Sequence, residues 1–474
     1  MRAERKNGFC VGLIQEAVMS DFETLRKEYP EFLYESYSVE RAEHEIILKF
    51  RFSLGETVFT PVTRIKTDNL RLVNAFDCAA AKRIVFYLGM VEAVSYWKAA
   101  CAPKVRVLCG ALSDKESEWF KKLWFSGLGE FFYRNGIDTD YEDFVEIVSQ
   151  GSRESISGGF NCSEINIIPV GGGKDSVVTT ELMSGFADKN MFFTVNDQPA
   201  REECVSAAGY DLSRIIRTYR TIDQNLLELN RRGFLNGHTP FSAIVAFLSY
   251  YCAYITGAKN IILSNEASAN EANVGGTQVN HQYSKSYEFE KDFSELMRGE
   301  FGADIRYFSL LRPFSEVQIA KMFASYPQYL SVFKSCNAGS KKNIWCGKCA
   351  KCLFVFIMLL PFADRAALEA AFGCNMLDKK ELSEDFNGLC GFSGVKPFEC
   401  VGTAREVRAA LELALKKYGG EPLPVLLEEY KQRRTPVSDE EINAIFSEFN
   451  EINGIPAEFD SAVRGMHKYV SAND

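Results

Sequence analysis

The sequence has 474 residues, of which 46% are hydrophobic and 25% charged, and this indicates a globular protein too long for one ordinary core. Its formal net charge of −9 argues against a protein that binds nucleic acid through the phosphate backbone, although a local basic groove stays open. The start of the chain, residues 1–8, leads into a segment without the apolar core of a signal peptide, so we expect a cytoplasmic protein.

The first region, residues 1–155, is predicted to form an α+β domain. Apolar and polar residues alternate over 48–54, which indicates a half-buried strand. A long helix is predicted over 79–101, and a capping box of Ser113 and Glu116 predicts the start of another helix. The many aromatic residues of this region favour a core between helices over a surface that stacks on a nucleobase.

The stretch 165–176 combines a strand, a glycine turn and a helix start. Its Ile- and Val-rich half predicts a buried strand, three glycines permit a tight turn, and Asp175 and Ser176 are expected to cap the helix that follows. Unpaired N–H groups and the helix dipole favour an anion there, with Lys174 beside it. The predicted phosphate site consists of Gly171, Gly172, Gly173, Lys174, Asp175 and Ser176.

The spacing of this glycine loop excludes two common phosphate loops. A Walker loop would need a glycine at Ile168 and a serine or threonine at Asp175, and the dinucleotide pattern also fails. The loop instead resembles the pyrophosphate loop of ATP pyrophosphatases, usually Ser-Gly-Gly-x-Asp-Ser, with Gly171 in place of the first serine. A glycine-rich turn without any ligand is the remaining alternative.

Strands and helices alternate after residue 163, which predicts a doubly wound parallel sheet that binds ligands outside the carboxyl ends of its strands. The expected strands cover 165–170, 191–195, 214–219 and 260–263. Polar residues follow each of these strands, Asn196 and Glu266 among them, and four polar strand ends in the same relative place indicate a site. The uncharged stretch 241–258 is predicted to be a buried helix rather than a membrane span.

We therefore expect three units. Residues 1–155 form the α+β domain, residues 156–375 form the nucleotide-binding α/β domain, and residues 376–474 form a mostly helical region. Two capping boxes, at Thr403 and at Ser438, support helices in the last unit.

Four of the fourteen cysteines form a group with nine, two and two intervening residues: Cys336, Cys346, Cys349 and Cys352. This spacing predicts a metal site of four thiolates, with structural Zn²⁺ favoured over an iron–sulfur cluster and spectator thiols third. Such a site would leave no open position for water. The other ten cysteines lie scattered through apolar runs and are expected to be core residues.

A polar segment between Glu266 and Arg312 carries further candidates. Lys285 and Arg312 could bind carboxylates or phosphates of a substrate. His281 is a candidate for acid–base catalysis, although a lone histidine is more often a satisfied side chain.

Five strings of the sequence carry a more specific signal. They are the glycine loop 171–176, Phe131-Phe132-Tyr133, Val279-Asn280-His281-Gln282-Tyr283-Ser284-Lys285-Ser286, Cys346-Gly347-Lys348-Cys349 and Lys396-Pro397-Phe398-Glu399-Cys400-Val401-Gly402-Thr403. Together they resemble the MurL family, the UDP-N-acetylmuramoyl-L-alanyl-L-glutamate epimerases of bacterial peptidoglycan synthesis. The resemblance extends from about residue 80 to about residue 405.

The resemblance implies an ATP pyrophosphatase fold of the PP-loop type, similar to the adenine nucleotide alpha hydrolases. It also implies an isomerase that inverts the terminal L-glutamate of UDP-MurNAc-L-Ala-L-Glu through an acyl adenylate, consuming ATP with Mg²⁺ and releasing AMP and diphosphate. What the first domain binds stays open, and the UDP-sugar half of the substrate is one candidate because this region lies outside the nucleotide fold.

In this interpretation the glycine loop holds the ATP phosphates, and Asn196 and Glu266 contact the nucleotide or Mg²⁺. Lys285 and Arg312 bind the substrate carboxylate or diphosphate. The epimerising base stays open among His281, Glu266 and a thiolate.

Two other functions remain open on the sequence. One is a carboxylate-activating relative of 7-cyano-7-deazaguanine synthase, which likewise combines a pyrophosphate loop with a four-cysteine zinc site. The other is a nucleotide-binding module without catalysis. The oligomeric state is open as well.

Overall fold

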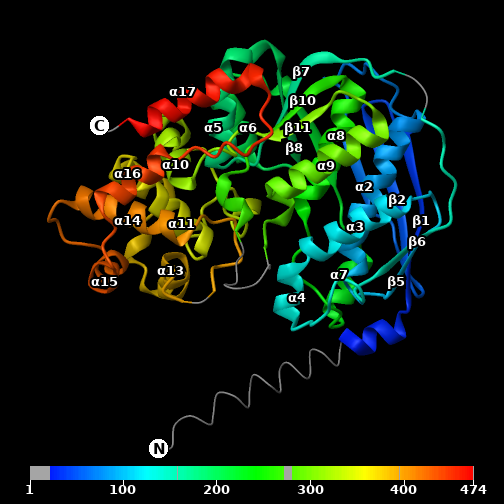
Figure 1. Cartoon of the computed structure of the whole chain (residues 1–474), viewed down its shortest axis with the longest axis horizontal. Coiled ribbons are helices and arrows are strands. Elements are labelled where there is room, and N and C mark those ends of the chain that lie inside the picture. Colours follow the sequence, from blue (N-terminus) through cyan, green and yellow to red (C-terminus); the bar gives the residue numbers. More distant parts are fainter. Residues whose placement is uncertain (1–21, 157–158, 272–279, 394, 473–474) are drawn as a thin grey trace, which may run out of the picture.

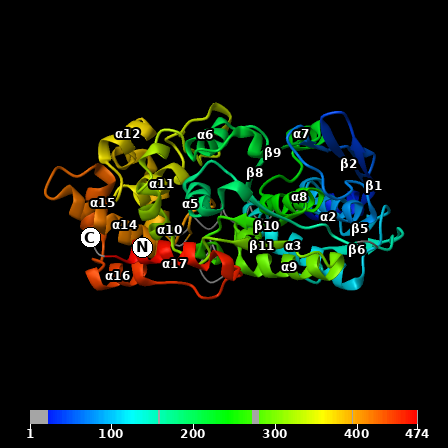
Figure 2. The same cartoon turned by 90° about the horizontal axis from the view of Figure 1, so that it is seen from above.

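The computed structural model of the chain describes residues 22–156, 159–271, 280–393 and 395–472. An 11-stranded sheet runs through this described part. The molecule is elongated, with the first strands at one end and the C-terminal helices at the other (Figures 1 and 2). Residues 1–8, and positions 272–273 and 279 of the predicted polar segment, lie outside the described residues.

Antiparallel pairing builds the first part of the sheet. Strand β2 pairs with β1, β3 and β4, while β5 and β6 extend the sheet in parallel from β1. The strands are β1 (Glu31–Arg41), β2 (Glu45–Leu54), β3 (Thr57–Phe59), β4 (Val62–Lys66), β5 (Lys104–Val107) and β6 (Glu146–Ser149). The helices are α2 (Ala79–Trp97), α3 (Asp114–Gly127) and α4 (Gly129–Asn135). The predicted strand over 48–54, the long helix and the capping box of Ser113 are confirmed.

Five parallel strands form the second part of the sheet, in the order β11-β10-β7-β8-β9. They are β7 (Ser163–Pro169), β8 (Asn190–Val195), β9 (Ile215–Arg220), β10 (Ala258–Leu263) and β11 (Arg306–Ser309). In chain order this is 3-2-1-4-5 read from β9, the order of a doubly wound sheet that reverses between β7 and β10. The four predicted strands and the mixed α/β architecture are confirmed, whereas the PP-loop type of fold stays a prediction.

Helices cover both faces of these parallel strands. On one face lie α5 (Lys174–Leu182) and α6 (Pro199–Ala207), and on the other lie α8 (Phe241–Thr256) and α9 (Tyr287–Phe301). Successive side chains of a strand point to opposite faces of the sheet, so neighbouring residues of β7 contact different sets of helices. Ile167 packs in the core with α8, and Ile168 packs in the core with α5.

The two parts of the sheet are continuous, because β4 pairs antiparallel with β9. A buried ion pair strengthens the junction: Arg220, at the end of β9, donates to both carboxylate oxygens of Glu92 in α2, at 2.7 and 2.8 Å. The boundary predicted at residue 155 therefore falls within one sheet, and the predicted domain limits stay predictions.

Helices make up most of the chain after β11, in accordance with the pattern read from the sequence. They are α10 (Glu316–Ala324), α11 (Ala350–Leu359), α12 (Arg365–Phe372), α13 (Ser383–Cys390), α14 (Ala404–Tyr418), α15 (Val425–Arg433), α16 (Asp439–Ser447) and α17 (Asp460–Ser471). The capping boxes of Thr403 and Ser438 are confirmed. Among the described helices, none has the length and apolar character needed to cross a membrane.

Candidate functional site

A cavity of about 710 Å³ lies at the carboxyl ends of β7 and β10. The glycine loop lines it after β7, and residues 264–266 line it after β10. These two strands flank the point where the strand order reverses, which is where doubly wound sheets bind ligands. The lining residues that the structure describes all lie between Pro169 and Cys400, so within the described ranges the first region contributes none.

The glycine loop leads directly into α5. Gly172 has a φ of +82°, a conformation that glycine adopts without strain, and Gly173 is the N-cap of the helix. No side chain caps α5, and Ser176 Oγ instead donates to the Gly173 carbonyl at 3.0 Å. The prediction that Asp175 and Ser176 cap the helix is therefore wrong, because both lie in its first turn. The N–H groups of that turn stay available to an anion.

Lys174 places a buried ammonium group beside the loop. Its Nζ donates to the carboxylates of Asp175 and Glu316. Burial opposes the charge of Lys174, but the two carboxylates outweigh this effect and raise its pKa, so the side chain stays protonated. Burial in turn raises the pKa of Glu316, and Lys174 opposes that rise. Sequence reasoning missed Glu316 because it enters from the start of α10, far along the chain.

The strand-end candidate Glu266 and the substrate-binding candidate Lys285 both line the cavity, whereas Arg312 lies behind them, and the roles predicted for all three stay predictions. Arg312 is fully buried and donates to the carbonyl oxygens of Glu266 and Lys285, at 2.9 and 2.7 Å. It also pairs with Glu290 at 3.0 Å. Arg312 thus holds the backbone of two cavity residues, and its direct contact with a substrate stays a prediction.

Asn196 and Arg220 are not among the described residues that line the cavity. Asn196 Oδ1 accepts a hydrogen bond from the Arg220 N–H at 2.8 Å, and the Arg220 side chain is engaged with Glu92. At the end of β8 the cavity is lined instead by Gln198 and Arg201. A role of Asn196 in nucleotide or Mg²⁺ binding stays a prediction.

Cys400 lines the cavity, and its thiol lies within a charged cluster. Lys285 Nζ donates to Cys400 Sγ at 3.0 Å, and His281 forms a hydrogen bond with the same thiol. His281 Nδ1 is also hydrogen-bonded to the carboxylate of Glu130, which comes from α4. Hydrogen bonds therefore connect the carboxylate of Glu130 to the imidazole of His281, and that imidazole to the thiol of Cys400 at the cavity. Many enzymes orient a nucleophile or base by such a series.

These contacts set the charges of the cluster. Burial would raise the pKa of Cys400, but Lys285 and the hydrogen bond with His281 outweigh it and lower the pKa to about 6. Burial would lower the pKa of His281, but Cys400 and Glu130 raise it to about 9. Near neutral pH the pair is a thiolate beside an imidazolium.

The expectation that Cys400 is an ordinary core cysteine is wrong. The signal available in the sequence was its place in the string 396–403, one of those that carry the family resemblance. Gly402 lets this segment approach α10 closely, since a Cβ there would lie 2.9 Å from Glu316 Cγ. Phe398 packs on Tyr133 of α4, with ring centroids 5.3 Å apart, which joins two of the strings.

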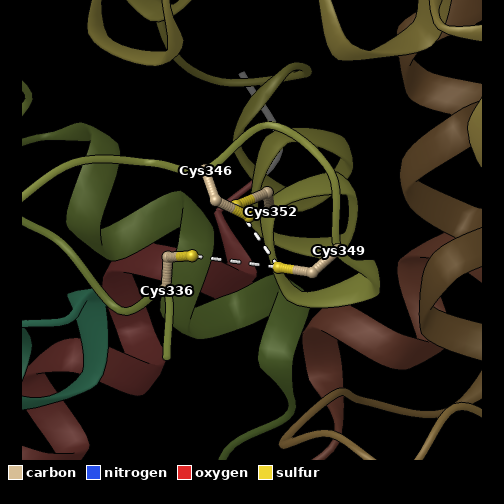
Figure 3. Close-up of side chains that lie close together, drawn as sticks. All are labelled: Cys336, Cys346, Cys349 and Cys352. Carbon is tan, nitrogen blue, oxygen red and sulfur yellow. Dashed lines mark hydrogen bonds between the residues drawn. The ribbon is translucent and has the colours of Figure 1, made fainter. Parts of the chain in front are cut away.

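The four predicted cysteines come together at the start of α11 (Figure 3). Cys349 is the N-cap of α11, Cys352 lies in its first turn, and Cys336 approaches from an earlier loop. The Sγ atoms of Cys349 lie 3.5 Å from Cys352 and 3.9 Å from Cys336, and those of Cys346 and Cys352 are 3.7 Å apart. A tetrahedron with metal–sulfur bonds of about 2.3 Å has edges of about 3.8 Å, so one ion fits this set.

Comparison with known proteins identifies the family. The model of the MurL N-terminal domain matches residues 23–310, and the model of the MurL C-terminal domain matches residues 332–443. The chain belongs to the MurL family. The resemblance read from the five strings is thereby confirmed. The two MurL models span the boundaries expected at residues 155 and 375, and those boundaries stay predictions.

Curated MurL relatives carry the name UDP-N-acetyl-alpha-D-muramoyl-L-alanyl-L-glutamate epimerase. One from Xanthomonas oryzae pv. oryzae is 33% identical over 71% of this chain and 75% of its own length. Those of a Micromonospora species and of Salinispora tropica are 32% and 33% identical over 83% of this chain, and over 89% and 87% of theirs.

Proposed function

We propose that the chain is an epimerase that inverts the terminal L-glutamate of UDP-MurNAc-L-Ala-L-Glu to D-glutamate, in peptidoglycan precursor synthesis, and that it consumes ATP to do so. Its MurL relatives carry the name of this activity. The observation that carries the ATP-dependent part is that one cavity contains both the glycine loop and a basic, thiol-bearing cluster around Cys400. Phosphate binding and proton transfer can then act on one carboxylate.

ATP has a chemical purpose in this reaction. Removing the α-proton next to a free carboxylate would place a second negative charge beside the first, which makes the proton hard to remove. Transfer of AMP to the carboxylate gives an acyl adenylate and diphosphate, and its carbonyl can accept the charge as an enolate. Reprotonation on the other face and hydrolysis then yield the D-glutamyl product and AMP.

Groups around the glycine loop suit the phosphates of ATP. The uncapped first turn of α5 offers N–H groups, and Lys351 offers an ammonium group at the cavity. Lys174 is not among the described residues that line the cavity, and its buried ammonium group lies behind the loop, paired with Asp175 and Glu316. Asp175, Glu266 and Glu316 lie close together. Burial raises the pKa of Glu316, and the charges of Asp175 and Glu266 raise it further. Their oxygens are ligands of the kind that Mg²⁺ prefers, and a bound Mg²⁺ would neutralise phosphate charge there.

We assign Zn²⁺ to the four cysteines, in a structural role. The Sγ separations of 3.5 to 3.9 Å match a single tetrahedral ion, whereas an iron–sulfur cluster would have to fit several atoms between the thiolates. Lys351 lies in the sequence between two of these cysteines, and its Nζ donates to the Cys400 carbonyl. The ion would therefore hold Lys351 against the segment that carries Cys400.

Diphosphate release tests this proposal. With ATP and Mg²⁺, we expect diphosphate and AMP to appear only when UDP-MurNAc-L-Ala-L-Glu is added. Replacing Lys174→Ala removes the buried cation of the loop and should lower the rate about a hundredfold or more. Lys189→Ala, at an exposed lysine, should behave as the unmodified protein.

Two results would overturn the proposal. One is diphosphate release with 7-carboxy-7-deazaguanine and none with the muropeptide, which would favour the synthase alternative. The other is an undiminished rate in Lys174→Ala, which would remove the role assigned to the glycine loop.

A further inference from the structure

The base that takes the α-proton is not identified by the family or by the glycine loop. Within the described ranges, the cysteines that line the cavity are Cys336 and Cys400, and Cys336 belongs to the four-cysteine cluster. The candidates left open by the sequence were Glu266, His281 and a thiolate, and all three are present among the residues that line the cavity, with Cys400 as the thiol outside the cluster. Their surroundings in the structure differ, and the difference selects one of them.

Glu266 is placed among the acids of the phosphate side. It lies at the end of β10, where its backbone is held by Arg312, and its charge acts on Glu316 and Glu406. A carboxylate in this position is suited to a cation beside the phosphates of ATP.

His281 is held as a cation. The Glu130 carboxylate bonds its Nδ1, and the ring also hydrogen-bonds the thiol, so both contacts favour the protonated ring. The ring centroid of His238 lies 4.3 Å from that of His281. Burial, and after it the charge of His281, lower the pKa of His238 to about 3. An imidazolium can orient the thiolate and donate a hydrogen bond, but it cannot accept a proton.

Cys400 has the features that a base needs. Cys400 lines the cavity, and its Sγ lies 3.0 Å from Lys285 Nζ and is hydrogen-bonded to His281, so two cations face the sulfur. Its pKa of about 6 makes it a thiolate at neutral pH. Lys285 also lies close to the proposed ATP site, because the charges of Glu266 and Asp175 both raise its pKa.

We propose that the thiolate of Cys400 removes the α-proton of the glutamyl adenylate, and that Glu130, through His281, is a positioning residue for it. This assignment rests on the proposed function. In the step, the Cα–H bond breaks, an S–H bond forms at Cys400, and the electron pair moves onto the carbonyl oxygen to give the enolate. A proton from water in the cavity then reaches the opposite face of Cα, and the thiol returns its proton to water.

The test separates adenylation from proton transfer. In D₂O with ATP, Mg²⁺ and UDP-MurNAc-L-Ala-L-Glu, rapid-quench measurement gives the diphosphate burst, and mass spectrometry gives deuterium at the glutamate α-carbon. In Cys400→Ser we expect the burst to persist while the deuterium rate falls about a hundredfold or more, the usual worth of a general base. Cys400→Ala should do the same, and Cys162→Ser, at an exposed cysteine, should leave both rates unchanged.

The other outcomes are distinct. Undiminished deuterium entry in Cys400→Ser, or a glutamyl thioester on Cys400 in the quenched unmodified protein, would overturn the role as base. Loss of the burst together with exchange, in a variant whose circular dichroism and melting match the unmodified protein, would overturn it too. If the unmodified protein gives no diphosphate with this substrate, it is the proposed function that fails.

The positioning role has its own readout. Glu130→Gln removes the charge that holds His281 protonated but leaves Cys400 in place. We expect diphosphate release to be kept, while the acidic limb of the deuterium-exchange profile moves to higher pH. An exchange profile of unchanged shape would overturn the positioning role of Glu130.

Discussion

Lys285 links the two chemical halves of the cavity. Its Nζ donates to Cys400, and its charge also interacts with Glu266 and Asp175 beside the glycine loop. Burial opposes its charge, yet Cys400 and these two carboxylates raise its pKa, so Lys285 remains a cation at every pH at which an enzyme is normally assayed. A single ammonium group can therefore hold the thiolate ionised and also face the carboxylates beside the glycine loop.

The pH profile of exchange tests this link. The thiolate is the active form, so exchange should fall as pH drops through about 6, the pKa of Cys400. Lys285→Met removes the cation that lowers the pKa of Cys400 most, which should raise that pKa and move the acidic limb upward by about one unit or more. His281 and Lys351 still face the thiol, so some of the shift in the pKa is retained.

The measurement is the rate of α-deuterium entry at saturating substrate between pH 5 and pH 9. The variant and the unmodified protein are compared by the pH of the acidic limb and not by the absolute rate. Lys285→Met also loses its proposed contact with the substrate, and that loss lowers the rate at every pH. Lys189→Met, at an exposed lysine, serves as the control. An acidic limb at the same pH in Lys285→Met would contradict the pairing of Lys285 with Cys400.

Single residues were predictable where the signal was local. The glycine loop could be read from the sequence because strand, turn and helix start are consecutive, and the four cysteines could be read from their spacing. Glu316 and Cys400 come from two remote segments that only folding brings to the cavity, and Glu130 comes from a third segment that folding places against His281. Arg312 was read as a ligand residue because an arginine pattern does not reveal burial, and the structure places it behind the cavity.

At the scale of elements, the start of α11 connects the cysteine cluster to the cavity. Cys349 caps this helix, Cys352 lies in its first turn, and Lys351 between them reaches the carbonyl of Cys400. A metal ion at the cysteines would therefore hold this helix end beside the segment of Cys400, in accordance with the structural role that we propose for it.

Metal analysis tests that arrangement. The unmodified protein should contain about one Zn²⁺ per chain, be colourless, and lose activity with the metal when treated with a chelator. Cys349→Ser removes one ligand and should lower the zinc content well below that value. Cys374→Ser, at a half-buried cysteine outside the cluster, should keep it. A brown protein containing iron, or full zinc content in Cys349→Ser, would contradict the assignment.

Element patterns were the most predictable level of the fold. Capping boxes at Ser113, Thr403 and Ser438 mark real helix starts, and alternation or apolar runs mark real strands. The order of the strands was less accessible, because pairing joins residues that lie far apart. The contact of β4 with β9, which makes one sheet of two predicted domains, has no local signal in the sequence.

At the scale of the whole molecule, the doubly wound sheet and the C-terminal helices lie in different parts of the elongated chain (Figure 1), and the cavity is lined by residues of both parts. The segment that carries Cys400 also contacts α4, where Phe398 packs on Tyr133. Sheet, helices and this segment each supply one part of the proposed chemistry. The loop after β7 is the proposed phosphate site, α10 and α11 provide the charged groups Glu316 and Lys351, and the segment of Cys400 provides a thiol. The site therefore requires the parallel strands and the C-terminal helices to be folded together.

The most direct test of the account is the configuration and isotope content of the glutamate recovered from UDP-MurNAc-L-Ala-L-Glu after reaction in D₂O, with and without ATP. The account predicts D-glutamate with one deuterium at the α-carbon when ATP and Mg²⁺ are present, and unlabelled L-glutamate without ATP. Inversion in the absence of ATP, or D-glutamate that retains its original α-proton, would contradict the claim that ATP serves to make this carbon acidic.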